Sequence, residues 1–184
     1  MVYKADKLLV RTIERKDELK LVKWLSNPKV LAFYEGRDKL YDLRMVREDF
    51  YQNEPEVSKC IVIYEGVAIG YIQFYEITER TSNLSGYGEN EVTYGMDQFI
   101  GEPNYWGKGI GTMLVQSMLD YLQQEKQVNV VVLDPHVTNY RAIRCYEKCG
   151  FKKIKQLSAH EYHEGEYRDC WLMEYRTRSR RGNS

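Results

Sequence analysis

The sequence predicts one domain that mixes helices and strands, in the α/β or α+β class. Its length of 184 residues is typical of a single domain. Segments with strand-like alternation of apolar residues recur between segments with helical periodicity. In the middle of the chain, a strand-like run at 91–100 is followed by a glycine-rich loop, a helical pattern and a short apolar run at 129–134. We expect the domain to span residues 1–176.

The first part of the chain is expected to begin with a strand and to continue with helices. Leu8–Thr12 has the apolar and β-branched composition of a strand. An amphipathic helix is expected over 15–26 and a short helix over 28–34, where a proline occupies the first turn. Asp42 is a candidate N-cap for a third helix, which runs through Tyr51.

The other predicted elements lie before and after the glycine-rich loop. Two alternating runs, 59–64 and 67–77, flank Glu65-Gly66, which predicts a β-hairpin. A helix after the last apolar run has Thr138 or Asn139 as its candidate N-cap. It ends near Gly150. The remaining expected elements are a polar loop over 78–90, two final strands over 151–157 and 167–176, and a connection over 158–166.

The glycine-rich loop has the sequence Tyr-Trp-Gly-Lys-Gly-Ile-Gly-Thr at residues 105–112, directly before a helical pattern. Glycine lets the backbone bend sharply and approach a ligand closely. The first N–H groups of a helix have no partner within it, so loop and helix together form a candidate cradle for a phosphate. The alternative is a flexible turn without a ligand. The glycine spacing excludes the dinucleotide fingerprint and the P-loop.

The charge of the chain is balanced but unevenly distributed. There are 27 basic and 27 acidic side chains, and four of the basic ones are arginines within 176–184, so the rest of the chain has a net charge of −4. An acidic body argues against nucleic-acid binding and is compatible with a cationic substrate. We expect residues 177–184 to form a basic, disordered tail.

Neither a membrane span nor a metal site is expected. No apolar run approaches the roughly 20 residues that cross a bilayer, and no signal-peptide pattern begins the chain, so we expect a cytoplasmic protein. The four cysteines lack the spacing of a disulfide framework. Cys145 and Cys149 could join His160 and His163 in a zinc site, but no Cys-x-x-Cys pair supports it, and we expect no metal.

Several segments of the chain carry a resemblance to a known family, namely 70–73, 94–99, 106–112 and 134–151, with Trp24-Leu25 and 33–36. Together they resemble the GCN5-related N-acetyltransferase (GNAT) superfamily, and within it the aminoglycoside 6′-N-acetyltransferases. The resemblance covers most of residues 8–175. Trp106 departs from the superfamily pattern, in which a Gln or Arg holds this place, while Gly109 and Gly111 are kept.

The resemblance implies a mixed, mostly antiparallel sheet with a splayed central pair of parallel strands, and acetyl-CoA as co-substrate. In the superfamily, a strand matching 96–100 donates main-chain N–H groups to the coenzyme arm. Asn139 is matched to a coenzyme contact and can cap its helix at the same time. The implied coenzyme-binding residues are Phe99, Ile100, Trp106, Gly107, Lys108, Gly109, Ile110, Gly111, Thr112 and Asn139.

Two residues match catalytic positions of the resembled family. Asp97 matches an aspartate beside the attacking nitrogen. A free aspartate has a pKa of about 3.9 and an alkylamine one near 10, so we expect Asp97 to orient the amine and to accept its proton as the new bond forms. Tyr146 matches a tyrosine near the coenzyme sulfur, where it would donate a proton or a hydrogen bond to the departing thiolate. Its alternative role is packing in the core.

For substrate binding, Asp134 matches a residue that recognises a cationic sugar. Other acids and aromatic side chains could add to the walls of a sugar site, although each acid could equally be a solvated surface charge. The expected substrate-binding residues are Tyr34, Glu35, Tyr94, Asp97, Asp134, Glu161 and Asp169, with Asp38, Glu164 and Trp171 as weaker candidates.

The resemblance therefore predicts an acetyl-CoA-dependent enzyme that acetylates the 6′-amine of aminoglycoside antibiotics and gives resistance. We expect a monomer or homodimer. One alternative is the same fold acting on a protein N-terminus, a lysine or a siderophore-precursor amine. Another is a non-catalytic acyl-CoA sensor, against which the presence of Asp97 and Tyr146 argues.

Overall fold

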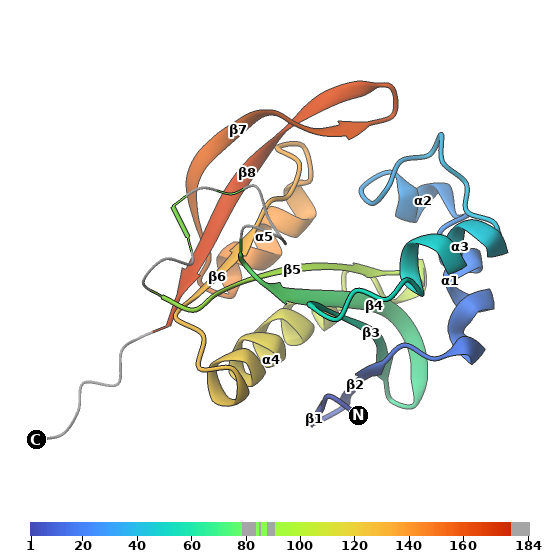
Figure 1. Ribbon diagram of the computed structural model, residues 1–184, viewed down its shortest axis with the longest axis horizontal. Coiled ribbons are helices and arrows are strands. Elements are labelled where there is room, and N and C mark those ends of the chain that lie inside the picture. Colours follow the sequence, from blue (N-terminus) through green and yellow to red (C-terminus); the bar gives the residue numbers. More distant parts are fainter. Residues whose placement is uncertain (79–83, 85, 88–90, 178–184) are drawn as a thin grey trace, which may run out of the picture.

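The computed structural model describes residues 1–78, 84, 86–87 and 91–177. In this part of the chain, eight strands form one mixed sheet in the order β1-β2-β3-β4-β5-β6-β8-β7 (Figure 1). The strands are β1 (Tyr3–Ala5), β2 (Leu8–Thr12), β3 (Val57–Tyr64), β4 (Val67–Glu76), β5 (Thr93–Ile100), β6 (Val130–Leu133), β7 (Lys152–His163) and β8 (Glu166–Arg176).

The helices cover both faces of this sheet. A core cluster on one face packs α4 and α5 against β2 to β6, and a second cluster on the other face packs α1 to α3 against β3, β4 and β5. No helix in the described ranges is both long and apolar enough to cross a membrane. The α-helices are α1 (Glu18–Trp24), α2 (Pro28–Leu31), α3 (Leu43–Phe50), α4 (Ile110–Glu125) and α5 (Tyr140–Lys148).

Local signals in the sequence account for several of these elements. The Asn27 side chain caps α2, with Pro28 in the first turn, and the Asp42 side chain accepts a 2.8 Å hydrogen bond from the Met45 N–H at the start of α3. Glu65 and Gly66 have φ angles of 47° and 84°, which is the left-handed conformation that a two-residue hairpin turn requires. The predicted hairpin is confirmed.

The strands β5 and β6 are parallel and separate after a short contact. Their paired residues are Thr93↔Val130, Tyr94↔Val131 and Gly95↔Val132, whereas β5 pairs with β4 as far as Ile100. After Gly95, β5 therefore pairs with β4 on one edge, and no strand among the described residues pairs with its other edge. This confirms the splayed parallel pair, and it opens the sheet beside the glycine-rich loop.

The expected connection over 158–166 is wrong, because β7 continues to His163. The turn is Glu164-Gly165, with φ angles of 51° and 86°, and His163 pairs with Glu166. Most side chains of β7 are exposed, since the β7–β8 hairpin projects beyond the helices (Figure 1). A strand exposed on both faces has no apolar alternation, which is why its sequence resembles a loop.

Two smaller differences concern the first part of the chain. β1 was not expected. The helix expected over 15–26 is a 3-10 turn, Arg15–Asp17, followed by the shorter α1. Arg176 is the last residue of β8 and pairs with Glu91 and Glu174. The predicted tail lies outside the described residues after Thr177, and so does most of the predicted loop over 78–90.

Candidate active site

The glycine-rich loop leads into α4 in a conformation that leaves main-chain donors free. Gly107 and Gly109 have φ angles of 71° and 78°, which side chains other than glycine rarely adopt. Gly109 is the N-cap of α4 and supplies no side-chain hydrogen bond to it. Because the N–H groups of the first turn have no acceptor within the helix, they are available to an anion.

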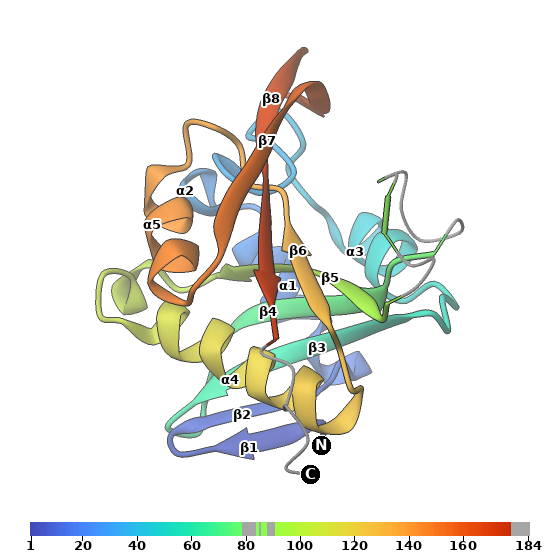
Figure 2. The same ribbon diagram turned by 90° about the vertical axis from the view of Figure 1, so that its left-hand side faces the viewer.

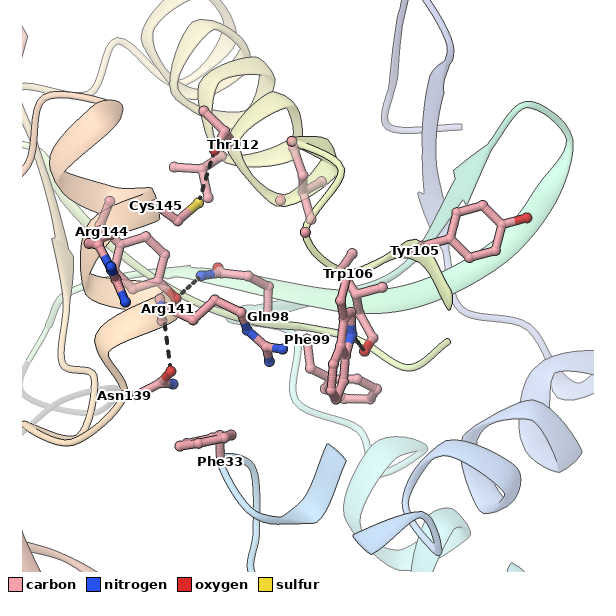
Figure 3. A pocket seen from close by; sticks show the side chains of 18 of the residues that line it. Phe33, Gln98, Phe99, Tyr105, Trp106, Thr112, Asn139, Arg141, Arg144 and Cys145 are labelled. Carbon is pink, nitrogen blue, oxygen red and sulfur yellow. Dashed lines mark hydrogen bonds between the residues drawn. The ribbon is translucent and has the colours of Figure 1, made fainter. Parts of the chain in front are cut away.

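A cavity of about 450 Å³ lies between this loop, β5 and α5, and we call it the loop cavity (Figure 3). A Cβ atom added at Gly111 would come no closer than 3.8 Å to the Cys145 sulfur, so the space beside this glycine belongs to the cavity. The Trp106 indole N–H donates a 2.8 Å hydrogen bond to the Ile100 carbonyl, which holds the loop against β5.

Among the residues that the structure describes, basic side chains and no acidic ones line the loop cavity. Arg141, Arg144 and Lys148 come from α5. The Arg141 guanidinium lies 4.0 Å from the centre of a Trp106 ring, and the two side chains face each other in Figure 3. A guanidinium stacked on an aromatic ring keeps its N–H groups at the edge, where they can bind phosphate oxygens. Trp106 thus positions a cation, although it has no charge itself.

A second cavity of about 380 Å³, which we call the acidic cavity, lies on the other side of the end of β5. Four acidic side chains line it, namely Glu35, Asp97, Asp134 and Glu161. Gln73 donates a 2.9 Å hydrogen bond to Asp97, and Tyr75 also hydrogen-bonds to this carboxylate. Burial, together with the charge of Asp134, raises the pKa of Asp97 to about 6.

The two cavities meet at residues that line both of them. Tyr146 is one, and its hydroxyl oxygen accepts a 2.6 Å hydrogen bond from the Gln98 side chain. Burial raises the pKa of Tyr146, so its hydroxyl keeps its proton at neutral pH. The shared residues are Phe33, Tyr34, Gln98, Asn139 and Tyr146. A ligand in one cavity can therefore reach a ligand in the other.

Two histidines hold the acids at the outer wall of the acidic cavity. His160 lies 2.8 Å from an oxygen of Asp134, and this hydrogen bond raises the pKa of His160. His136 Nε2 lies 2.9 Å from Glu161 Oε2. Asp134 follows β6 directly, while His160 and Glu161 belong to β7, so the β7–β8 hairpin forms one side of this cavity.

The structure brings most of the expected site residues to these two cavities. Asn139 lines both, and its side chain accepts a 3.3 Å hydrogen bond from the Ala142 N–H, which confirms the helix cap. The expected residues that line the loop cavity include Phe99, Ile100, Trp106, Gly107, Gly109, Gly111 and Thr112, and those that line the acidic cavity include Tyr34, Glu35, Asp97, Asp134 and Glu161.

Four expected residues line neither cavity. Tyr94 packs in the cluster on the α4 face, because strand alternation turns it away from Asp97. Asp169 accepts hydrogen bonds from Gln156 and from the Ala159 N–H within the β7–β8 hairpin. Ile110 is buried in the core, and the Lys108 ammonium lies 5.9 Å from the Tyr105 ring.

The three weaker candidates also lie outside the acidic cavity. Glu164 pairs with Arg37, and the Lys153 ammonium lies 5.4 Å from a ring of Trp171. Asp38 is exposed in the segment between α2 and α3.

Several residues of the site were missed from the sequence. Arg141, Arg144 and Lys148 are separated by three and four positions, which places them on one face of a helix. That spacing could have identified them. Tyr75 could not have been found in this way, because the position of its ring depends on Gly95, its partner on β5. A Cβ atom at Gly95 would lie 2.8 Å from the Tyr75 ring.

Comparisons with known proteins show what the chain is similar to. The acetyltransferase (GNAT) domain family matches residues 14–159. An aminoglycoside N(6′)-acetyltransferase type 1 from Klebsiella pneumoniae is 30% identical over 154 residues, which are 80% of this chain and 75% of that protein.

Solved structures extend the comparison. The structure of AAC(6′)-Ib in complex with ribostamycin and coenzyme A is 27% identical, with a TM-score of 0.73, and the match covers 97% of this chain and all of that one. A spermidine N-acetyltransferase from Vibrio cholerae, in complex with CoA and spermine, shares the fold at 21% identity. Its TM-score is 0.75, with 92% of this chain and 95% of that one covered.

Proposed function

The chain belongs to the acetyltransferase (GNAT) domain family and is an acetyl-CoA-dependent N-acetyltransferase, and from this premise we propose that it acetylates the 6′-amine of aminoglycosides. One observation carries the proposal. A cavity lined by three cations and a cavity lined by four carboxylates meet at Gln98 and Tyr146. A polyanionic acyl donor and a polycationic acceptor would each be attracted to one cavity, and their reactive ends would meet where the cavities join.

The loop cavity suits the diphosphate of the coenzyme. The uncapped first turn of α4 offers N–H groups, and Gly107 and Gly109 give the loop the left-handed turns that expose them. Arg141 adds a positioned guanidinium, which compensates for the Gln or Arg that Trp106 replaces in the motif. Bound there, acetyl-CoA supplies the acetyl group as a thioester.

Asp97 is the proposed base. Its pKa of about 6 keeps it ionised at neutral pH, so it can hold the substrate ammonium by charge. A pKa of 6 also makes it a stronger base than a solvent-exposed aspartate, although still a weak one toward an alkylammonium. The amine nitrogen becomes acidic while it bonds to the acetyl carbon, and at that stage the proton passes to Asp97.

Tyr146 is the proposed partner of the departing sulfur. Its oxygen accepts from Gln98, so its own O–H remains to be donated. Burial raises the pKa of this phenol, so the phenol retains its proton. We therefore propose that Tyr146 stabilises the thiolate by donating a hydrogen bond. The C–S bond breaks as the C–N bond forms; the thiolate then takes a proton from water, and Asp97 releases the amine proton to solvent.

The acidic cavity fits a multiply charged acceptor. Asp134 follows β6 and Glu161 lies on β7, whereas Glu35 belongs to the segment after α2, so carboxylates from separate elements can pair with charged groups at several positions of one substrate. Acetylation at the 6′ position removes one positive charge, which weakens the attraction of an aminoglycoside to RNA phosphates. Resistance to these drugs would follow.

A substrate series tests the proposal. Thiol release from acetyl-CoA is measured with a kanamycin-type aminoglycoside that bears a 6′-amine, with a matched one that bears a 6′-hydroxyl, with spermidine, and with a peptide that has a free N-terminus. We expect turnover with the 6′-amine and none with the 6′-hydroxyl. Calorimetric titration with coenzyme A confirms that each protein sample is competent.

Other outcomes would replace the proposal. Protein that binds coenzyme A but turns over only spermidine would be a polyamine acetyltransferase. The acidic cavity can also accommodate a polyamine. Preference for the peptide would favour an N-terminal or lysine acetyltransferase. Coenzyme binding without turnover of any amine would identify an acyl-CoA sensor.

A further inference from the structure

Three potential metal ligands gather beside the acidic cavity, one after β6 and two on β7, the strands on either side of β8 in the sheet. His136 follows β6 and forms an isolated β-bridge with Cys170 of β8. Glu161 and His163 lie two residues apart on β7, so their side chains leave the same face of that strand. Figure 2 shows β6, β8 and β7 side by side, running steeply across the direction of β1 to β4.

The ligand atoms of these residues converge. One donor atom from each of His136, Glu161 and His163 lies within 4.8 Å of the other two. His136 Nε2 and Glu161 Oε2 are 2.9 Å apart, and the two imidazole rings meet edge to face with centroids 4.7 Å apart. Ligand atoms around a tetrahedral zinc ion are separated by about 3.3 Å, given bonds of about 2.0 Å. Small side-chain rotations would therefore complete the geometry.

His163 gives an independent indication of a ligand. Its side chain is 4% exposed, and its Nδ1 atom is buried with no hydrogen-bond partner in the described part of the chain. Its other ring nitrogen lies 3.8 Å from the Glu164 carboxylate, which is too far for a hydrogen bond. A buried polar atom without a partner is costly, and coordination of a cation satisfies an imidazole nitrogen.

We propose that His136, Glu161 and His163 bind a zinc ion at the wall of the acidic cavity. Two imidazoles and one carboxylate favour zinc and similar transition-metal ions over magnesium or calcium, which require mostly oxygen ligands. Three protein ligands leave a fourth position for water. This site contains none of the cysteines considered from the sequence, and acetyl transfer does not require it.

Occupation of the site has a consequence that rests on the proposed function. Glu161 is one of four carboxylates that line the acidic cavity, and His136 lines it as well. A divalent ion there adds two positive charges to the wall that receives a cationic substrate. Zinc should therefore raise the KM for the aminoglycoside and leave coenzyme A binding unchanged.

Calorimetry with untagged, chelator-treated protein tests the site without relying on activity. Zn²⁺ is titrated into the wild type and into Glu161→Gln, His163→Ala and His160→Ala, with Co²⁺ as a spectroscopic probe of four-coordination. His160 is the control, because it is the remaining histidine and pairs with Asp134 instead. We expect one equivalent of zinc in the wild type and His160→Ala, and binding weaker by roughly 100-fold or more in the two ligand variants.

Glu161→Gln keeps the test decisive if loss of buried His163 impairs folding, since the Glu161 side chain is 47% exposed. The proposal is overturned if folded wild-type protein binds no zinc, or if Glu161→Gln binds it as tightly as the wild type. Loss of binding in His160→Ala would also overturn it, since the ion would then lie at Asp134. Failure of aminoglycoside turnover leaves these binding results intact and concerns only the proposed function.

Discussion

The side-chain amide of Gln98 donates a 2.6 Å hydrogen bond to the hydroxyl oxygen of Tyr146. Gln98 follows Asp97 on β5, and consecutive residues of a strand point to opposite faces. The strand therefore places the Asp97 carboxylate on one side and, through Gln98, orients the phenol on the other. Splaying of β6 away from this part of β5 makes room for both groups.

Replacement of Tyr146 by Phe should lower kcat by about 100-fold, the lower end of the usual contribution of a general acid or base. The KM for acetyl-CoA should change little, since the ring can keep its packing against Phe151. Steady-state thiol release measures both values. Tyr140→Phe is the control on the same helix, where the side chain is 65% exposed. An unchanged kcat in Tyr146→Phe would remove this tyrosine from the reaction.

The activity should fall in acid with a midpoint near pH 6. Burial and Asp134 raise the pKa of Asp97 to about 6, so the carboxylate dominates above that pH and the inactive protonated form below it. The profile of kcat/KM against pH should therefore rise through about 6 and then level off. Asp97→Asn should lose about 10²- to 10⁴-fold in kcat, together with this acid limb.

Tyr75→Phe provides the matched test of that assignment. The Tyr75 hydroxyl hydrogen-bonds to the Asp97 carboxylate and lowers the pKa of Asp97, so its removal should move the acid limb to higher pH. The variant retains the base, so much of the activity at pH 8 should remain. A limb that stays in place, or that persists in Asp97→Asn, would mean that another group titrates.

Replacement of Arg141 by Ala should weaken coenzyme binding by about tenfold, as expected for loss of one charge-assisted contact of about 1.5 kcal/mol. The salt dependence of binding should also become shallower. Calorimetric titration of coenzyme A at two salt concentrations measures both effects. Arg44→Ala is the control, because Arg44 pairs with Glu48 on α3 and lines neither cavity. Equal affinities for the two variants would exclude Arg141 as a phosphate ligand.

Several elements of the fold followed from local sequence signals, whereas the candidate catalytic residues Asp97 and Tyr146 came from the resemblance to the GNAT superfamily. The cap at Asp42, the turn at Glu65-Gly66 and the left-handed glycines of the loop each act over a few residues, so one sequence is enough to find them. Strand alternation also fixes that Tyr94 and Asp97 face opposite sides. Applying it would have removed Tyr94 from the substrate site.

The parts that were missed depend on contacts between distant segments. His136 meets Glu161 and His163 only because β8 lies between β6 and β7 in the sheet, which no local pattern specifies. The length of β7 was missed because an exposed hairpin lacks the apolar alternation of a half-buried strand. Elements with one buried face can therefore be predicted from the sequence more readily than exposed ones.

The tip of the β7–β8 hairpin is tied to the segment after α2 by an ion pair. Arg37, which follows α2, donates side-chain hydrogen bonds of 2.6 and 2.7 Å to Glu164, and its main-chain N–H donates a third of 2.9 Å. Arg37 pairs with this carboxylate and lowers the pKa of Glu164 to about 2. Glu35 and Glu161 line the acidic cavity, and each lies a few residues before one member of the ion pair. The ion pair therefore connects two segments that line the cavity.

Replacement of Arg37 by Ala should therefore raise the KM for the cationic substrate by about two- to fivefold, the range expected for loss of an exposed ion pair, with kcat nearly unchanged. Added salt should raise the wild-type KM toward that of the variant, because it screens the same contact. Glu164→Gln should have a similar effect, and the double variant should be no worse than either single one, since both changes break one tether. Lys7→Ala, which breaks a surface pair with Glu65 outside both cavities, is the control. Additive effects of the Arg37 and Glu164 substitutions on KM would show that the two residues act separately. The hairpin would then hold its position without the ion pair.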